Sequence, residues 1–334
     1  MRQHNQIGDM LCSLTLYKAL KIKYPGAQIT LVAAKTNYQI PYFDINPYID
    51  HVITFDKSSL KEIFNFLKYL RSRKYQIGVV PSTILLSRTS HIINYISGAK
   101  NRVGVTSFDG KENKSHKYLN IKSAFVWKST HQTERNLQVI KQIGCDLSTD
   151  EISSIKIDIN DSDLDYANKF ILDNFPDENK NVIAFHPGAG KEANVWDSDN
   201  FTKLIKRLYI EFQSYILITS GWTDDKVVEN ISAELIQSNI EFKILDKAPV
   251  KKLGAVLSMI DLYITNDTGV MHIAGYSGAN LISLFGSTNP KEWAPKRKNQ
   301  KYIKAADNNI NSISVDEVFE LAKTFLTVNQ NKRK

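Results

Sequence analysis

Hydrophobic positions recur along this chain in two patterns that follow one another in turn. Short runs of β-branched and aromatic residues predict strands, and longer segments with apolar residues three or four positions apart predict amphipathic helices. Alternation of the two patterns is typical of parallel α/β units. In the first half of the chain we expect strands at residues 29–33, 51–55, 76–80 and 102–106, and helices at residues 11–24, 59–73, 89–97 and 132–143.

The second half of the chain repeats the scheme. We expect strands at residues 182–186, 215–220, 242–245, 262–265 and 280–285, and helices at residues 199–212, 224–238, 250–259 and 268–277. A last amphipathic helix is predicted at residues 314–328, where six apolar side chains share one face.

The boundary between the two halves is predicted in the polar stretch at residues 145–161, where only a short extended piece at 155–159 interrupts the polar pattern. The length of 334 residues suits two domains of ordinary size. We therefore expect Rossmann-like domains at residues 1–155 and 156–312. A C-terminal helix with a basic tail, residues 313–334, is expected to pack back on the first domain.

The composition is that of a soluble globular protein, with 42% hydrophobic and 23% charged residues. No apolar run approaches the ~18 residues that a membrane-spanning helix needs, and the first residues lack the apolar run of a secretory signal. Cys12 and Cys145 are the only cysteines in the sequence, and they form no metal-binding spacing. These features predict a cytoplasmic protein without disulfides or structural zinc.

The net charge of +8 favours anionic partners, such as phosphorylated substrates or lipid head groups. Basic residues concentrate at residues 296–304 and in the tail at 332–334, although an ordinary solvated surface would explain them as well. The sequence contains no recognisable nucleic-acid-binding module, so we expect no nucleic-acid partner. Peripheral contact with an anionic membrane surface is expected instead.

The clearest chemical signal lies at residues 262–295, which predict a strand, a turn, a helix and a second strand. Thr268 and Gly269 open the helix, and a helix that begins with small residues offers free N–H groups to an anion such as a diphosphate. His272 lies one turn further on, and Asp267 precedes the helix. We interpret these four residues as a diphosphate site. The alternative is that Asp267 only caps the helix and His272 is a core histidine.

This segment resembles the signature of the glycosyltransferase family 9 heptosyltransferases. Twelve positions agree with it: Asp267, Thr268, Gly269, His272, Ala274, Gly278, Leu284, Phe285, Gly286, Thr288, Pro290 and Pro295. Two further blocks resemble the family in the expected order, namely a Gly-Asp loop with its helix at residues 7–32 and a Pro-Gly-Ala turn followed by a tryptophan at residues 182–208.

The resemblance implies the GT-B architecture, in which two Rossmann-like domains face each other across a cleft. The first domain would bind the acceptor and the second a nucleotide sugar, with ADP-heptose among the candidate donors. The implied reaction is an inverting, metal-independent transfer of heptose or a related sugar to the lipopolysaccharide core or another cell-envelope glycan. Beyond the nucleotide sugar, which is a co-substrate, no cofactor is expected.

Inverting transfer needs a base for the acceptor hydroxyl, and the resemblance assigns that role to Asp9. Gly8 would support a tight turn that presents Asp9, while a reading of Asp9 as the N-cap of the following helix also remains open. The motif should follow a first strand, yet only six residues precede Ile7. That strand would then be very short or lie upstream of Met1.

Donor binding is assigned less firmly to five residues: Gly188, Lys191, Asn194, Trp196 and Asp225. Asn194 stands where the family has a lysine that assists the leaving diphosphate, and nearby Lys191 could take that role. Asp225 or Asp224 matches an acidic donor-binding residue, although helix capping explains Asp224 equally well. These departures suggest a donor sugar or nucleotide different from ADP-heptose.

Other chemistries find little support in the sequence. Asp-x-Asp pairs occur at expected helix starts, so we expect no metal site, and the run at residues 188–191 lacks the remainder of a phosphate-binding loop. Two alternatives to a transferase stay open. One is a nucleotide-sugar epimerase or hydrolase of the same fold, and the other is a nucleotide-sugar-binding protein with impaired catalysis.

Overall fold

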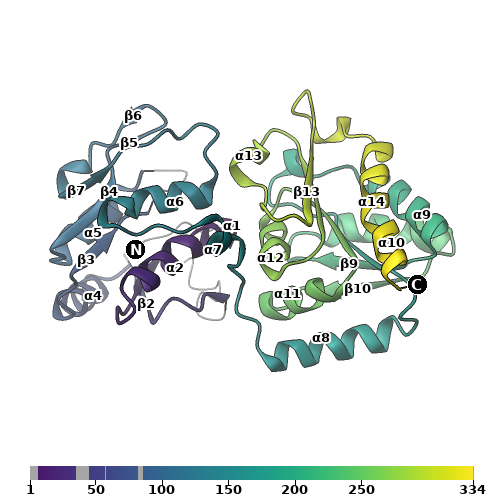
Figure 1. Cartoon of the computed structure of the whole chain (residues 1–334), viewed down its shortest axis with the longest axis horizontal. Coiled ribbons are helices and arrows are strands. Elements are labelled where there is room, and N and C mark those ends of the chain that lie inside the picture. The colour runs from purple at the N-terminus through teal and green to yellow at the C-terminus, as the bar shows by residue number, and fades with distance from the viewer. Residues whose placement is uncertain (1–6, 35–44, 57, 82–85, 334) are drawn as a thin grey trace. The chain divides into compact units, whose positions relative to one another are not determined.

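The computed structural model describes residues 7–34, 45–56, 58–81 and 86–333, with side-chain surroundings given as far as residue 327 apart from Ala34. The chain divides into two compact units, Met1–Ile155 and Lys156–Lys334. Each unit contains parallel strands joined by helices, as the alternating sequence pattern predicts (Figure 1). The units are described one at a time below.

The second unit is built on a six-stranded parallel sheet in the order β10-β9-β8-β11-β12-β13. The strands are β8 (Val182–His186), β9 (Tyr215–Ser220), β10 (Phe242–Asp246), β11 (Leu262–Asn266), β12 (Leu281–Phe285) and β13 (Gln300–Lys304). Counted along the chain within this unit, the order is 3-2-1-4-5-6, the doubly wound arrangement. Every residue of β8, β11 and β12 is buried, as expected for central strands covered on both faces.

Helices cover both faces of this sheet. One face carries α9 (Ser198–Phe212), α10 (Asp225–Gln237) and α14 (Val315–Arg333), whose apolar residues enter the main core of the unit. The other carries α8 (Asp161–Asn174), α11 (Val250–Met259) and α12 (Gly269–Ser277), which pack against one another. A capping box of Asn160 and Asp163 starts α8, so this acidic pair serves a helix start.

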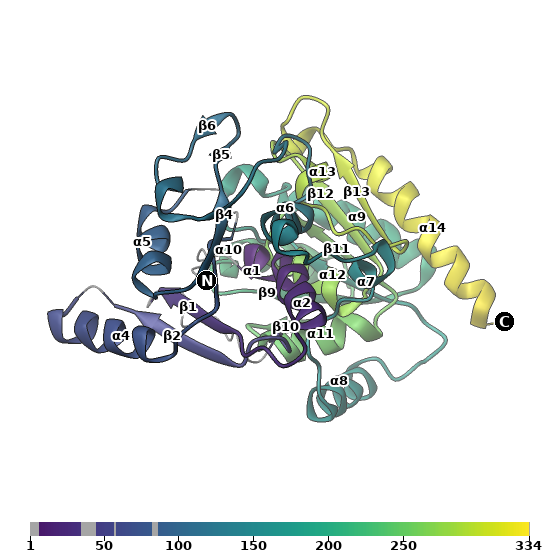
Figure 2. The same cartoon turned by 60° about the vertical axis from the view of Figure 1, so that its left-hand side comes forward.

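The C-terminal helix packs differently from the sequence-based expectation. Instead of returning to the first domain, α14 joins α9 and the sheet of the second unit, where Val318, Phe319, Ala322 and Leu326 are at most 2% exposed. The guanidinium of Arg207 on α9 lies 3.6 Å from the centre of the Phe319 ring. The apolar face of α14 is therefore used within its own unit (Figures 1 and 2).

Strand β13 was not predicted, because its sequence Gln-Lys-Tyr-Ile-Lys is too polar to read as a buried strand. It pairs with β12 at the end of the sheet. Lysines at such a position discourage pairing with a further strand. Part of the basic run at residues 296–304 thus lies on an edge strand, with Lys301 exposed.

The first unit contains parallel strands in two groups. In one, β1 (Thr30–Ala34) pairs with β2 (His51–Phe55), and in the other β3 (Ile77–Val79), β4 (Asn101–Val105) and β7 (Ile121–Ser123) form a three-stranded sheet. A short hairpin, β5 (Ser107–Phe108) with β6 (Lys111–Glu112), and β7 were not predicted. The helices are α1 (Ile7–Cys12), α2 (Leu14–Lys23), α4 (Leu60–Ser72), α5 (Arg88–Ile96), α6 (Gln132–Ile140) and α7 (Thr149–Ser153).

The first predicted helix is broken at Ser13. The Ser13 hydroxyl donates to the Met10 carbonyl at 2.7 Å, a local bond that competes with regular helix geometry. Asp9 consequently lies inside α1 and does not cap α2, whose N-cap is Ser13, so the expected Gly-Asp loop is a helical turn. The strand expected before this motif lies outside the described residues.

Candidate active site

The connection between β11 and α12 forms the centre of the candidate site in the second unit. Asn266 ends the strand, Gly269 begins the helix, and only Asp267 and Thr268 lie between them. Thr268 is the N-cap in extended conformation, with φ −149° and ψ 170°, and its side chain makes no capping bond. The N–H groups of the first helical turn have no acceptor within the helix. They and the helix dipole make this end of α12 attractive to a phosphate.

The carboxylate of Asp267 is held by its neighbours. The Asn194 amide nitrogen donates to Asp267 Oδ2 at 3.0 Å and to the Asp267 carbonyl at 3.2 Å. Burial raises the pKa of Asp267, and a hydrogen bond from Thr288, the positive charge of Lys191 and the Asn194 bond oppose that rise. Asn194, which replaces the lysine of the resemblance, therefore orients Asp267 and supplies no charge itself.

Asn266 fastens the loop after β8 to the end of β11. It is fully buried, its amide nitrogen donates to the Pro187 carbonyl at 2.8 Å, and its side-chain oxygen accepts from the Trp196 N–H at 3.2 Å. Buried side-chain amides require such partners, because an unmade hydrogen bond in the interior costs about 1–3 kcal/mol. The sequence analysis did not single out this role, although a polar residue closing an apolar strand was the available signal.

Gly188 lies where no larger residue fits. A Cβ atom there would fall 2.1 Å from Oδ1 and Cγ of Asp224, which is buried and accepts from the Gly221 N–H at 2.6 Å. The structure thus places Asp224 against the predicted donor loop. Asp225 instead binds the Lys247 ammonium at 2.9 Å with a side chain that is 61% exposed.

A buried polar network that sequence reasoning missed lies beneath this loop. His186, the last residue of β8, has Nε2 3.5 Å from Asp224 Oδ2 and Nδ1 3.1 Å from the Thr219 carbonyl. The Thr219 hydroxyl in turn lies 2.8 Å from the Tyr263 hydroxyl. Burial lowers the pKa of His186, while the Asp224 carboxylate pulls it upward. The only sequence signal was a histidine at the end of an apolar strand.

His272 lies in the first turn of α12 and is 5% exposed, with its ring edge-on to Trp293 at 6.4 Å between centroids. Burial lowers the pKa of His272 to about 4, so the ring is neutral at neutral pH. It can therefore exchange hydrogen bonds near the end of the helix without adding a fixed positive charge.

The remaining two predicted residues occupy different surroundings. Trp196 has no exposed surface; its indole N–H donates to the Ile313 carbonyl at 3.0 Å and its ring packs against Phe201. Its side chain supports the loop from the core and does not face a ligand. Lys191, by contrast, is exposed and close enough to act electrostatically on Asp267.

In the first unit, Asp9 lies in α1 and is 3% exposed. The short helix is fastened to α6, because the Asn136 amide donates to the Cys12 carbonyl at 3.0 Å and the Thr15 hydroxyl to the Thr133 carbonyl at 3.1 Å. Burial and the nearby Asp9 carboxylate both raise the pKa of Cys12. These contacts fix the backbone that carries Asp9.

Two searches over the described ranges complete the picture of the site. Among these residues no group of three or more His, Cys, Asp or Glu side chains is arranged to hold a metal ion. Within the same ranges, no helix combines the length and apolarity needed to cross a membrane.

Comparison with known proteins identifies the family. The model of glycosyltransferase family 9 (heptosyltransferase) matches residues 63–322, well over half of the chain. The chain belongs to glycosyltransferase family 9. The resemblance drawn from the three sequence blocks is thereby confirmed, and the protein is a glycosyltransferase.

Individual relatives of this family 9 glycosyltransferase are distant but extend over most of its length. It is 25% identical over 326 residues to lipopolysaccharide heptosyltransferase 3 of Escherichia coli, which covers 92% of this chain and 88% of that protein. It is 27% identical over 182 residues to lipooligosaccharide heptosyltransferase 2 of Campylobacter jejuni, which covers 54% of this chain and 56% of that protein.

Solved structures show the same fold. The ADP-heptose lipopolysaccharide heptosyltransferase II of Escherichia coli matches with a TM-score of 0.77 at 19% identity, covering 98% of both chains. A family 9 glycosyltransferase from Veillonella parvula matches with a TM-score of 0.78 at 18% identity, covering 98% of this chain and 96% of that one. These likenesses confirm the predicted GT-B fold with its Rossmann-like domains.

Proposed function

We propose that this glycosyltransferase moves a heptose or related sugar from a nucleotide diphosphate sugar to a lipopolysaccharide-core or other cell-envelope glycan, with inversion at the anomeric carbon. The observation that carries the proposal is the turn from β11 to α12, where the open helix end, the oriented Asp267 and the exposed Lys191 lie together. The printed functions of the relatives, lipopolysaccharide and lipooligosaccharide heptosyltransferases, support the sugar and acceptor classes.

The donor diphosphate is expected on the first turn of α12. Cleavage of the sugar–phosphate bond leaves negative charge on the departing diphosphate, and preorganised N–H groups and cations lower the energy of that charge. Gly269 allows close approach to the backbone. Lys191 supplies the positive charge, because Asn194 is neutral and already engaged with Asp267. A metal ion is not required by this arrangement.

Asp9 acts in this proposal as the general base. The acceptor hydroxyl loses its proton to the Asp9 carboxylate while its oxygen forms a bond to the anomeric carbon, and the carbon–oxygen bond to the diphosphate breaks with its electron pair. The nucleoside diphosphate leaves in the same displacement, so the anomeric configuration inverts. Burial of Asp9 in a helix held by α6 suits a base that must keep one orientation.

The test is a panel of nucleotide sugars, including ADP-heptose, incubated with the full chain in the presence and absence of a lipopolysaccharide-core acceptor. We expect nucleoside diphosphate release to require both one donor and the acceptor, with the sugar recovered on the glycan. Turnover of a donor without acceptor would show an epimerase or hydrolase instead. Donor-induced thermal stabilisation without turnover, for any acceptor tried, would indicate a binding protein.

The proposal includes a location in the cytoplasm with peripheral contact at the inner face of the membrane. The net charge of +8 and the exposed Lys296, Lys298 and Lys301 support attraction to anionic lipid, worth about 1 kcal/mol per basic residue near the surface. Co-sedimentation with vesicles should therefore increase with anionic lipid content and decrease with salt. Binding that is indifferent to both would contradict the membrane contact without affecting the proposed transfer reaction.

A further inference from the structure

The strands of the first unit follow the order of the second unit with one position left out. Numbered by their place in a doubly wound sheet, β10-β9-β8-β11-β12-β13 corresponds to 3-2-1-4-5-6. The first unit has β2-β1 and β3-β4-β7, which corresponds to 3-2 and 4-5-6. Among the residues that the structure describes, no strand occupies the first position, the one that would lie between β1 and β3.

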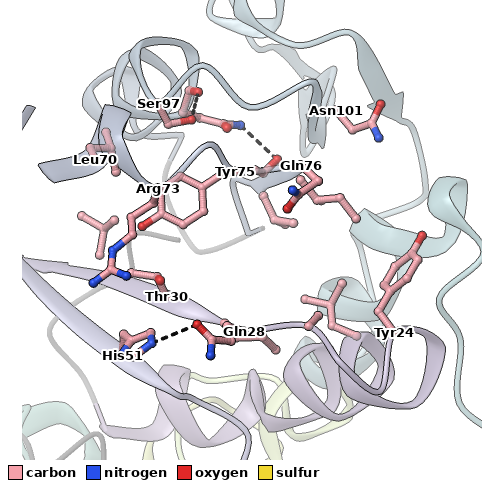
Figure 3. Close-up of a pocket in the computed structure, with 18 of the residues that line it drawn as sticks. Tyr24, Gln28, Thr30, His51, Leu70, Arg73, Tyr75, Gln76, Ser97 and Asn101 are labelled. Carbon is pink, nitrogen blue, oxygen red and sulfur yellow. Dashed lines mark hydrogen bonds between the residues drawn. The ribbon is translucent and has the colours of Figure 1, made fainter. Parts of the chain in front are cut away.

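A cavity of about 710 Å³ lies between the same two strands (Figure 3). Thr30 and Gln28 border it on one side and Tyr75 and Gln76 on the opposite side. Helices α2, α4 and α5 contribute further walls, for example through Leu20, Leu70 and Ile93. Removing one strand from a sheet leaves about 9.5 Å between its neighbours, twice the ordinary strand spacing. A space bordered by strands at its sides and by helices has the form of a vacant strand position.

The backbone of β1 directs hydrogen-bonding groups into this cavity. Backbone N–H and C=O groups of successive strand residues point alternately to the two sides of the strand. The Ile29 carbonyl accepts from the His51 N–H of β2 at 3.1 Å, so Ile29 and Leu31 face β2. Thr30 and Val32 therefore face away from β2, and both line the cavity.

Strand β3 does the same from the opposite side. The Val80 N–H donates to the Val103 carbonyl and the Gln76 carbonyl accepts from the Asn101 N–H, both at 2.9 Å, so the even-numbered residues face β4. Ile77 and Val79 therefore turn their N–H and C=O groups toward the cavity, which they line. Two facing rows of strand-edge groups are what a parallel ladder on both sides of an inserted strand requires.

Helix α5 adds buried polar atoms to the wall. Of the described side chains, the Ser90 hydroxyl and the Asn94 side-chain oxygen are buried without a hydrogen-bond partner, and the two residues are 4% and 7% exposed. Both residues line the cavity. Buried polar atoms without partners are costly, and a peptide backbone passing beside α5 brings N–H donors.

We propose that this cavity is a strand-accepting site, which takes an extended apolar peptide of about five residues in parallel orientation between β1 and β3. Main-chain hydrogen bonds on both sides provide affinity, and apolar side chains fill the space toward α2 on one face and α4 and α5 on the other. A central strand covered by helices on both faces has this near-continuous apolar character, as β8 does in the second unit.

The experiment adds to the 334-residue chain a synthetic peptide of about five Val and Ile residues flanked by lysines for solubility. We expect saturable binding and a rise of a few degrees in the midpoint of thermal unfolding. The same peptide with a central proline, which removes an N–H and cannot complete the ladder, serves as the control. Equal binding of both peptides, or binding of neither, would overturn the proposal.

Amide hydrogen exchange locates the peptide. The N–H groups of Thr30, Val32, Ile77 and Val79 should exchange more slowly with bound peptide, while Leu31, which already faces β2, should change little. Protection of alternate residues is a signature that a globular apolar ligand in the same cavity does not produce. Uniform protection, or protection elsewhere in the chain, would contradict insertion as a strand.

Filling the cavity provides the matched pair of variants. Ser90→Phe adds a ring on the wall of the cavity, whereas Thr89→Phe adds the same ring next to it on α5, at a residue that does not line the cavity. We expect Ser90→Phe to abolish peptide binding and Thr89→Phe to retain it, with both variants folded by circular dichroism. Should Ser90→Phe not fold, the exchange pattern in the unaltered chain still decides the question. Retained binding in a folded Ser90→Phe variant would contradict this location.

Discussion

The two units share one scheme but hold their functional segments by different means. In the second, the fully buried β8 occupies the first position of the sheet and leads directly into the loop with Gly188 and Lys191. In the first, α1 with Asp9 is secured by side-chain hydrogen bonds to α6, while the described part of the sheet has a cavity at that position. The comparison shows that a donor loop can be fixed by sheet pairing and a base-bearing helix by helix packing.

The largest effect is expected at the proposed base of the first unit. Asp9→Asn keeps the size of the side chain and removes its ability to accept a proton. We expect turnover to fall about 10²–10⁴-fold, while donor affinity, which belongs to the second unit, stays nearly constant. Turnover and calorimetric donor binding measure the two quantities. Unchanged turnover would remove Asp9 from the mechanism, and an equal loss of donor affinity would contradict the division of roles.

The next effect concerns the donor loop after β8. Gly188→Ala forces a Cβ atom to within 2.1 Å of the Asp224 carboxyl group, and overpacking of this kind costs about 1–3 kcal/mol. We expect a lower midpoint in urea unfolding together with weaker donor binding. Gly190→Ala in the same loop is the control, because a Cβ there meets nothing within 4 Å. Similar losses in both variants would show that loop flexibility, and not the contact with Asp224, is responsible.

A third prediction uses the neutral His272 of the second unit. Its pKa is about 4 in the folded chain and about 6.5 when unfolded, so the unfolded state binds more protons between these values. Its contribution to stability is complete above pH 6.5 and declines as the pH falls toward 4, by about 2 kcal/mol at pH 5.

Urea unfolding at pH 7 and pH 5 measures this change. His272→Gln should reduce the difference in unfolding free energy between the two pH values without removing it, because burial also lowers the pKa of His186. An identical difference in the variant and the unaltered chain would show that His272 is not the group that titrates.

The smallest effect is expected for the exposed cation of the donor loop. Lys191→Met removes the positive charge near Asp267, and we expect roughly tenfold weaker donor binding, since charge-assisted contacts contribute about 1.5 kcal/mol or more. Lys203→Met, an exposed change on α9, is the control. The difference between the variants should diminish at high salt. Equal affinities would leave the diphosphate to the N–H groups of α12 alone.

Local sequence patterns predicted much of this protein. The bounds of β2, β8, β9 and α11 agree with those read from the sequence, because each is a clear periodic segment bounded by turn residues. The turn from β11 to α12 was also predicted, since the chemistry of a helix end depends on a few consecutive residues. The family followed from three short blocks in the expected order.

The tertiary structure alone decided which distant groups meet. It placed Asp224 instead of Asp225 against Gly188, joined Asn194 to Asp267, buried Trp196 in the core and turned α14 onto its own unit. Local patterns specify which face of an element is apolar, but not which partner covers that face or which neighbouring carboxylate is buried. Those choices are made by packing among residues far apart in the chain. The same holds for β13, whose polar sequence reads as a strand only beside β12, and for the cavity between β1 and β3.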